Sequence, residues 1–278
     1  MKVVGIGDNV ADCYHHLGLM FPGGQAFNFS AYCQMNGVES AYIGVFGSDD
    51  AGCHLVSVAN QLGIDISHCR YVDGENGKAI IDLKNGDRVF VCSNRGGVLK
   101  GHPLTLTKED LEYLKSFDLL HTSNNSYFDQ QLVRIKDLPI LKSYDFSRSW
   151  EDEKRTYEIC RWIDFGFISC SGFEKADILK QLTLMHTWGC KVCVATMGEF
   201  GSIAITENEA CSFQPEVVDA LDTLGAGDSF AAGFLMQWLR QNDSSIMHRK
   251  LEACLREGAK LAAQTCMVHG AFGYPTSL

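Results

Sequence analysis

Proline is scarce in this sequence, and long unbroken apolar runs are missing. Only 5 of the 278 residues are proline. No apolar stretch reaches the roughly 18 residues that a membrane-spanning helix needs. The chain also lacks internal repeats, low-complexity segments and a linker that would divide it. These absences argue against a membrane protein and a repeat protein, and they predict a single domain over residues 1–278 with a substantial core.

Runs of lysine and arginine are missing as well. The 24 basic residues are outnumbered by 34 acidic ones, which gives a formal net charge of −10. Proteins that bind nucleic acids usually present a basic face. The charge therefore argues against nucleic acid as a partner and favours small-molecule ligands.

Cysteine is plentiful, with 12 residues, but it does not form a metal-binding pattern. Cys190 and Cys193 make one C-x-x-C pair, and no second pair stands at the spacing of a structural zinc site. Most of the cysteines lie inside apolar segments, as Cys33 does. We therefore expect buried, reduced thiols and a cytoplasmic protein.

Strand-like and helix-like segments alternate along most of the chain, which predicts an α/β fold with a mostly parallel central sheet flanked by helices. Thr107, with Asp110 three residues later, is the N-terminal capping pattern of one expected helix. Apolar, β-rich runs predict strands at 2–7, 41–46, 117–122, 140–145, 164–169 and 191–196. Helical periodicity predicts helices at 25–36, 50–62, 107–115, 173–187, 226–240 and 247–267.

Two regions, 10–20 and 69–98, interrupt this alternation with short β-rich runs. Two runs of the second region are separated by Asn85-Gly86, a pair that favours a tight hairpin turn. Strands joined by such a turn are antiparallel, so we expect a small antiparallel sheet outside the main one. Such a sheet suits a lid over a ligand, and its open strand edges favour a homodimer formed through 69–98.

The most informative segment spans residues 222–233 and reads Asp-Thr-Leu-Gly-Ala-Gly-Asp-Ser-Phe-Ala-Ala-Gly. Gly225 and Gly227 let the backbone turn tightly at the start of an apolar helix. The first amides of a helix lack partners and carry the positive end of its dipole, so they bind phosphate or a charged transition state. The segment is not a Walker P-loop, because no Gly-Lys-Ser/Thr follows the glycines.

Asp228 lies in the first turn of the same helix. A carboxylate there is able to accept the proton of an attacking hydroxyl group. The alternative is that Asp228 only stabilises the helix dipole, which is common for acidic residues at helix starts.

A second glycine-rich segment, residues 22–28, opens the first expected helix. Gly23 and Gly24 let a ligand approach the backbone closely, and Asn28 offers a donor and an acceptor, which suits a sugar diol. A plain turn followed by a polar residue in the first helical turn explains the pattern equally well.

Together, the two segments resemble the signature motifs of the PfkB carbohydrate kinases, and the resemblance extends over nearly the whole chain. Gly23-Gly24-x-x-x-Asn28-x-Ser30 matches the first motif, and residues 222–228 match the second. The resemblance implies a ribokinase-like fold with a β lid, and an enzyme that transfers the γ-phosphoryl group of ATP, with Mg²⁺, to a sugar hydroxyl. Asp228 would be the catalytic base, and the anion hole would be formed by Gly225, Ala226 and Gly227.

The same resemblance implies roles for the other site residues. The sugar would be held by Asp12, Gly23, Gly24 and Asn28. ATP would be bordered by Gly225, Gly227 and a third matching segment that contains Thr196, Gly198 and Gly201. Asp222 and the carbonyl of Leu224 match positions that often bind a monovalent cation such as K⁺. Arg95 would contact substrate or phosphate from the lid, although a solvated loop charge also explains it.

One departure from the family pattern concerns the magnesium site. Many members carry Asn-x-x-Glu on the turn near the metal, and here the stretch is Ser171-Gly172-Phe173-Glu174. Glu174 would still reach Mg²⁺ through water. Serine replaces the asparagine, which changes the expected water network.

Within the family, the sequence most resembles the fructoselysine 6-kinases. The matching pieces include Gly7-Asp8-Asn9 and Asp145-Phe146-Ser147. This implies that fructoselysine is phosphorylated at carbon 6 of its fructosyl unit. The free cationic amine of that substrate is expected to meet Asp8, Asp12 or Glu75.

Three other functions fit parts of the pattern. Another kinase of the family, such as a fructokinase, ribokinase or nucleoside kinase, would share both motifs. A non-catalytic sugar sensor would share the fold, but the intact segment 225–228 argues against it. Gly5-x-Gly7 suggests a nucleotide-dependent oxidoreductase, but Val10 stands where that fingerprint needs its third glycine.

Overall fold

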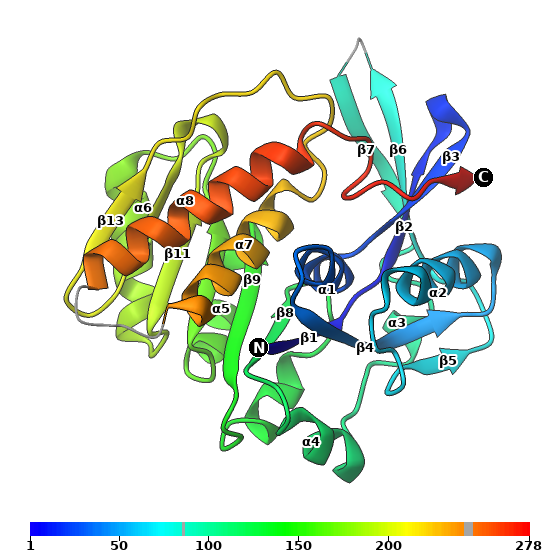
Figure 1. The fold of residues 1–278 in the computed structure, drawn as a ribbon, viewed down its shortest axis with the longest axis horizontal. Helices are drawn as coiled ribbons and strands as arrows, with labels where there is room; N and C mark the ends of the chain where they lie inside the picture. Colours follow the sequence, from blue (N-terminus) through cyan, green and yellow to red (C-terminus); the bar gives the residue numbers. More distant parts are fainter. Residues whose placement is uncertain (85–86, 242–246) are drawn as a thin grey trace.

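The computed structural model describes residues 1–84, 87–241 and 247–278, and it is built around a sheet of nine strands (Figure 1). Their order is β13-β12-β11-β10-β9-β8-β1-β4-β5, and the seven from β11 to β5 run parallel to their neighbours. The last two, β12 and β13, are added antiparallel at one edge. The strands are β1 (Lys2–Gly7), β4 (Glu39–Gly47), β5 (Arg70–Val72), β8 (Leu119–Ser123), β9 (Leu141–Ser147), β10 (Phe165–Ser169), β11 (Val192–Thr196), β12 (Ser202–Ile205) and β13 (Ala210–Phe213).

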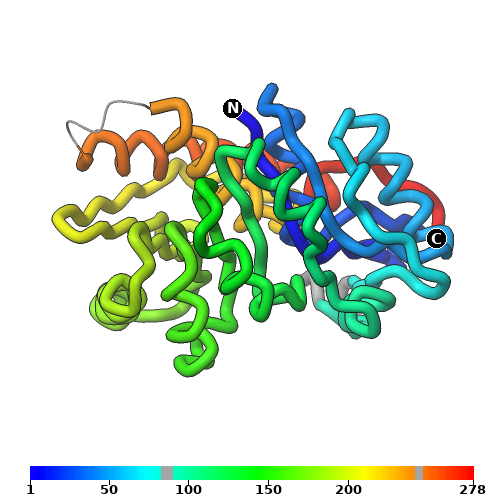
Figure 2. The backbone as a smooth tube through the Cα atoms, turned by 90° about the horizontal axis from the view of Figure 1, so that it is seen from below, coloured from blue at the N-terminus to red at the C-terminus, as the bar shows by residue number. Residues whose placement is uncertain are grey.

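Helices cover both faces of this sheet, because successive side chains of its buried strands point to opposite faces. In β1, Val3 packs into one hydrophobic layer, whereas Val4 and Ile6 pack into the other. The first layer is covered by α1 (Gln25–Met35), α2 (Asp50–Leu62), α7 (Ala226–Arg240) and α8 (Met247–Thr265). The second is covered by α3 (Val98–Gly101), α4 (Lys108–Leu114), α5 (Glu153–Cys160) and α6 (Lys175–Thr187). Figure 2 shows the orange α8 and the green helices on opposite sides of the molecule.

A second sheet of five strands stands beside the first and corresponds to the predicted lid (Figure 1). Its order is β14-β3-β2-β6-β7, with β2 (Val10–Tyr14), β3 (Leu19–Gly23), β6 (Gly77–Lys84), β7 (Asp87–Ser93) and β14 (Thr276–Ser277). The predicted antiparallel pairing of β6 with β7 is confirmed, while Asn85-Gly86 lies outside the described residues. Because β2 begins directly after β1, the lid lies at the carboxyl ends of the parallel strands.

The prediction and the structure differ at the short elements. Strand β5 falls inside the predicted lid range 69–98, but it pairs with β4 of the large sheet, so the lid begins only at β6. A strand of three residues is too short to show a periodic pattern. The other elements absent from the prediction are α3, α5, β12, β13, β14 and the 3₁₀ turns His15–Leu17, Asp129–Arg134 (η2), Ser149–Glu151 and Gly198–Phe200 (η4). All of them except α5 and η2 have at most four residues, so the same reason applies to them.

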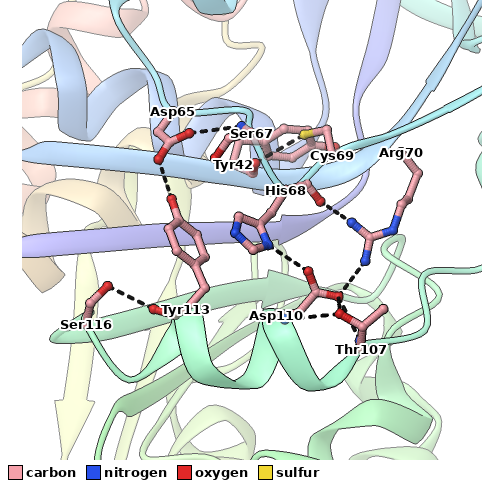
Figure 3. A network of polar contacts seen from close by, with 10 residues as sticks. All are labelled: Tyr42, Asp65, Ser67, His68, Cys69, Arg70, Thr107, Asp110, Tyr113 and Ser116. Carbon is pink, nitrogen blue, oxygen red and sulfur yellow. Dashed lines mark hydrogen bonds and ion pairs between the residues drawn. The ribbon is translucent and has the colours of Figure 1, made fainter.

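A polar network around the buried Asp110 joins β5 and the segment before it to helix α4 (Figure 3). Thr107 and Asp110 form the predicted capping box, with their side chains bonded to each other's amides at 3.1 and 2.7 Å. The Asp110 carboxylate also accepts a hydrogen bond from Arg70 and lies 2.9 Å from Nδ1 of His68. The His68 ring stacks on Tyr113 at 3.9 Å between centroids. The network therefore holds the edge of the sheet against α4.

All twelve cysteines lie in the described part of the chain and carry free thiols. Cys190 and Cys193 are fully buried, so the prediction that this C-x-x-C pair belongs to the core is confirmed. Among the described residues, no helix has both the length and the apolar character to cross a membrane.

Candidate active site

Two cavities open at the carboxyl ends of the parallel strands. The lid cavity, of about 790 Å³, is lined by lid residues such as Asp12 and by residues that follow β1 and β8. The second cavity, of about 560 Å³, is lined by the ends of β10 and β11 and by the η4 turn before β12. We call it the hairpin cavity after the antiparallel pair of β11 and β12, which is separate from the lid. Both are lined by the segment 223–228: Leu224, Gly225 and Asp228 face the lid cavity, and Thr223, Ala226 and Gly227 face the hairpin cavity. The predicted anion-binding turn therefore lies between two ligand-sized spaces.

The backbone of this turn requires glycine at one of its two positions. Gly225 precedes α7 with a φ of 75°, and a Cβ atom there would lie 2.6 Å from the Tyr32 hydroxyl. Gly227 is different, because a Cβ atom there would meet nothing within 4 Å. The open side of Gly227 faces the hairpin cavity, where a phosphate group would be able to approach the first amides of α7.

Asp228 lies in the first turn of α7 and is only 8% exposed. Asn28 Nδ2 donates a hydrogen bond to Oδ2 of Asp228 at 2.6 Å. Burial, together with the negative charges of Asp145 and Asp8, raises the pKa of Asp228 to about 7, against the effect of the Asn28 bond. A carboxyl group with such a pKa is poised to take up a proton at neutral pH, as a general base must.

Asp145, near the end of β9, is a second buried carboxyl group, and its charge acts on Asp228 although it lines neither cavity. Burial raises its pKa to about 6, although the amide of Ser147 donates to it at 2.6 Å. Asp145 is not among the predicted site residues, although it belongs to the Asp-Phe-Ser stretch that carries part of the family resemblance. The signal available was its position at the carboxyl end of a parallel strand, where polar residues gather around ligands.

The structure brings Asp8 to the lid cavity, but its carboxylate already holds the cavity wall together. Oδ2 accepts the amide of Gln25 at 2.7 Å, and Oδ1 accepts the amide of Ala26 at 3.2 Å. The hydroxyl groups of Ser123 and Ser126 donate to Oδ1 at 2.9 and 2.8 Å. Asp8 therefore caps α1 and joins it to the turn after β8.

The other predicted sugar-binding residues occupy different parts of the same region. Asp12 and Gly24 line the lid cavity, as does Asn28, whose buried Oδ1 has no partner among the described residues. Gly23 leaves space for the Asp12 side chain, since a Cβ atom at residue 23 would lie 1.9 Å from Oδ2 of Asp12. Asp12, Gly24 and Asn28 line the same cavity as Asp228, and their polar groups are suited to hydroxyl groups of a sugar.

The two remaining predicted substrate contacts lie at the periphery. Arg95 lines the rim of the lid cavity with a φ of 56°, and its carbonyl accepts the Tyr127 hydroxyl at 2.9 Å. Tyr127 also has a positive φ, of 50°. Glu75 does not line the cavity, and its carboxylate lies 4.0 Å from the Lys78 ammonium group. The structure therefore does not bring Glu75 to the site.

The hairpin cavity contains the residues predicted to border ATP. Thr196, Gly198 and Gly201 line it, together with Ala226 and Gly227. Its opposite wall was not predicted and comprises the loop 215–218 and three small residues of α8, which are Ala259, Ala262 and Ala263. Small apolar side chains on a helix leave a flat surface, which suits the planar ring of a base.

Asp222 joins the turn to the lid. Its Oδ2 accepts the Tyr14 hydroxyl at 2.5 Å and the amide of Gly270 at 3.0 Å, while Oδ1 accepts the amide of Leu224 at 2.9 Å. The predicted monovalent-cation site at Asp222 and Leu224 is thus a carboxylate that already binds three donors. Glu174 precedes α6, is exposed and lines neither cavity. Among the described residues, no three His, Cys, Asp or Glu side chains are grouped to hold a metal ion.

A glycine-rich turn at a helix start, beside a buried carboxyl group and between two cavities, is the arrangement expected of a phosphotransferase that acts on an alcohol group. The sequence-family model of the pfkB family carbohydrate kinases matches residues 15–135 and 167–276 of this chain. The chain therefore belongs to the pfkB family of carbohydrate kinases, which confirms the prediction.

Curated relatives are similar over nearly the whole length. Fructosamine kinase FrlD of Bacillus subtilis is 37% identical over 276 residues, which are 99% of this chain and 94% of that protein. Fructoselysine 6-kinase of Escherichia coli is 32% identical over 267 residues, 96% of this chain and 98% of that protein. Fructokinase-2 of rice is 27% identical, over 87% of this chain and 76% of that protein.

Solved structures share the fold. The ribokinase of Thermotoga maritima matches with a TM-score of 0.76 at 21% identity, over 99% of this chain and 95% of that one. The ribokinase of Arabidopsis thaliana, solved with ribose and ATP, matches with a TM-score of 0.77 at 20% identity, over 98% and 94%. The ribokinase-like architecture expected from the sequence is confirmed.

Proposed function

We propose that this protein transfers the γ-phosphoryl group of ATP to carbon 6 of a fructosyl amine, with fructoselysine as the substrate. One observation carries the proposal: the turn 225–228 lies between a polar cavity beside Asp228 and a cavity lined by small residues. The fructosyl amine as acceptor is supported by the names and the similarity of the Bacillus and Escherichia relatives.

In this mechanism the lid cavity holds the sugar and the hairpin cavity holds the nucleotide. Asp228 takes the proton of the 6-hydroxyl group while the hydroxyl oxygen forms a bond to the γ-phosphorus. The bond from that phosphorus to the bridging oxygen of ADP breaks, and ADP leaves with the electron pair. The first amides of α7 stabilise the negative charge on the transferring group, and Asn28 orients the base.

Mg²⁺ is expected to accompany ATP and to neutralise charge on its phosphates. In kinase sites this ion is bound mainly by phosphate oxygens and water, with one or two carboxylates, so it needs no dedicated protein cage. Ser171 lines the hairpin cavity, and Glu174 follows three residues later, directly before α6, so we propose Glu174 as a ligand through water. K⁺ beside Asp222 is a further proposal, and dependence of kcat on added K⁺ tests it.

The lid sheet supports two further proposals. Closing the lid over the sugar would exclude water, which otherwise competes as an acceptor and hydrolyses ATP. Strand β7 is at the edge of this sheet, and Phe90 and Val91 on it are highly exposed. We therefore propose a homodimer formed through the lid, which Val91→Lys is expected to convert to a monomer in light scattering. The twelve free thiols and the need for ATP favour the cytoplasm.

A coupled assay of ADP release across a panel of acceptors tests the proposed function. We expect kcat/KM for fructoselysine to exceed that for fructose, ribose and nucleosides by at least about 100-fold, since binding energy from the distal part of a substrate also lowers the barrier. Preference for a free sugar or a nucleoside would instead indicate a fructokinase, ribokinase or nucleoside kinase. Absence of turnover with every acceptor would favour the sugar sensor.

A further inference from the structure

The lid cavity is larger than a hexose requires, and it extends from one face of the sheet to the other. At about 790 Å³ it lies in the upper part of the range of roughly 300–1,000 Å³ for small-molecule sites. Asp228 enters it from α7 on one side of the sheet, whereas Arg155 enters it from α5 on the other. A substrate whose reacting hydroxyl lies at Asp228 therefore has space for a second portion near Arg155.

Arg155 is held in one orientation by three bonds. Its Nε donates to Oδ2 of Asp129 at 2.7 Å, and its Nη2 donates to the carbonyl of Asn124 at 2.8 Å and to the Tyr144 hydroxyl at 2.9 Å. The Tyr144 hydroxyl in turn donates to Oδ1 of Asp129 at 2.7 Å. The guanidinium plane is therefore fixed before any ligand arrives.

One nitrogen of Arg155 is left for a ligand. Within the described parts of the chain, Nη1 makes no hydrogen bond, and the side chain keeps 30% of its surface exposed while lining the cavity. A planar guanidinium group with free N–H donors binds carboxylates strongly and with defined geometry. A lysine ammonium group would not reproduce this arrangement, because it is a flexible point charge.

We propose that Arg155 recognises the carboxylate of the amino acid portion of the substrate, so that the enzyme prefers glycated amino acids to glycated amines that lack a carboxylate. The inference rests on the proposed function and assigns a specificity residue to it. Among the described residues, Arg95 is the other cation that lines the cavity. It lies on the exposed rim, and no hydrogen bond of its side chain to another described residue orients it. Orientation before binding distinguishes Arg155, because a preorganised donor loses less entropy on binding.

The test compares Nε-fructosyl-lysine with fructosyl-cadaverine, which differ by the carboxylate alone. For the wild-type enzyme, kcat/KM should be about 10- to 100-fold higher with fructosyl-lysine, as expected for one charge-assisted bond. Arg155→Met should remove this preference by lowering kcat/KM for fructosyl-lysine and leaving fructosyl-cadaverine within about 3-fold. Arg155→Lys retains the charge, so it should keep part of the preference for fructosyl-lysine. This variant replaces Arg155→Met in the test if the Met variant folds poorly. Arg161→Met, an exposed arginine one position after α5, is the matched control and should behave as wild type.

Two results would overturn the role assigned to Arg155 and leave the proposed function intact. These are equal wild-type kcat/KM for both glycated amines, and an Arg155→Met variant whose kcat/KM falls by the same factor with both, which is the signature of a purely structural role. If the wild type instead prefers free fructose or ribose to both glycated amines, the proposed function fails, and the assignment fails with it.

Discussion

Asp110 and Asp228 are both buried carboxylates, 1% and 8% exposed, yet their pKa values are shifted in opposite directions. For Asp110, burial raises the pKa, but bonds from Thr107, His68 and Arg70 outweigh it, and the pKa lies below its usual value. For Asp228, burial acts with the charge of Asp145 and is opposed by one bond from Asn28, and the pKa rises to about 7.

The comparison shows that the donors around a carboxylate, and not burial alone, decide whether it is structural or reactive. The network around Asp110 supplies donors from a helix cap, a histidine and an arginine, so the charge is stable and the group does not take up protons near neutrality. The site around Asp228 places a second carboxylate, Asp145, near it and leaves the proton affinity high. Titratable groups whose pKa is strongly shifted cluster at active sites.

The largest expected effect comes from Asp228→Asn, which removes the proposed base. We expect kcat to fall about 10³-fold, because general-base catalysis contributes roughly 10²–10⁴-fold. The coupled kinase assay measures this loss, and ATP affinity by calorimetry should stay near the wild-type value. Unchanged turnover would show that Asp228 serves only the helix dipole.

The stability of Asp228→Asn is its internal control. Because the folded-state pKa of Asp228 is raised to about 7, the neutral acid favours folding, and this contribution is complete below the unfolded pKa of about 3.9 and lost as pH rises through 7. Asparagine does not ionise, so we expect the Tm of the variant at pH 8 to equal or exceed that of the wild type. A lower Tm would indicate that the loss of activity reflects unfolding.

The next effect concerns the two glycines of the turn. Gly227→Ala adds a methyl group that meets no protein atom within 4 Å but enters the hairpin cavity, so we expect a normal Tm and a fall in kcat/KM for ATP of about 100-fold. Gly225→Ala should instead lower the free energy of unfolding by about 1–3 kcal/mol, since its φ is 75° and Tyr32 lies against the added atom. A Gly227→Ala enzyme with wild-type ATP kinetics would argue against phosphate at this turn.

Asp110→Ala should affect stability and not catalysis. Removing it leaves the half-exposed Arg70 and His68 without their partner and breaks the cap of α4, so we expect a loss of about 2–3 kcal/mol in the free energy of unfolding. Denaturant titration measures this, and kcat/KM should stay within about 2-fold. Glu112→Ala on the same helix is the control, because its pair with Lys115 is exposed. Because the pKa of Asp110 is lowered, the difference from wild type should shrink as pH falls toward about 3.9 and below.

The smallest effect is a shift of the pH profile. Asp228 must be ionised to accept a proton, so kcat/KM should rise with pH through about 7 and then level off. Asp145→Asn removes a like charge near Asp228, so the rising limb should move to lower pH. A limb that stays in place after Asp145→Asn would show that the charge of Asp145 does not raise the pKa of Asp228.

Much of the proposed nucleotide side could be predicted, because it is built from backbone, and Thr196, Gly198 and Gly201 do line one cavity. A turn that binds an anion through its amides needs glycines at fixed spacing, and Gly225 and Gly227 display this need directly in the sequence. Gly198 and Gly201 likewise mark a turn that needs glycine, since their φ values are 61° and 92°. The proposed sugar side is built from side chains of many segments, and no local pattern shows that Arg155 lines the lid cavity or that the charge of Asp145 acts on Asp228.

The sequence by itself determined the α/β class, the order of the main strands and helices, the antiparallel lid strands and the glycine-rich turn before α7, because periodicity and glycine placement act over a few residues. The tertiary structure alone decided that Asn28 bonds to Asp228 across 200 residues, that Asp8 is bonded to the cavity wall, and that three hydrogen bonds orient Arg155. Charge, burial and donor number depend on distances in space, and these are set only when distant segments pack together.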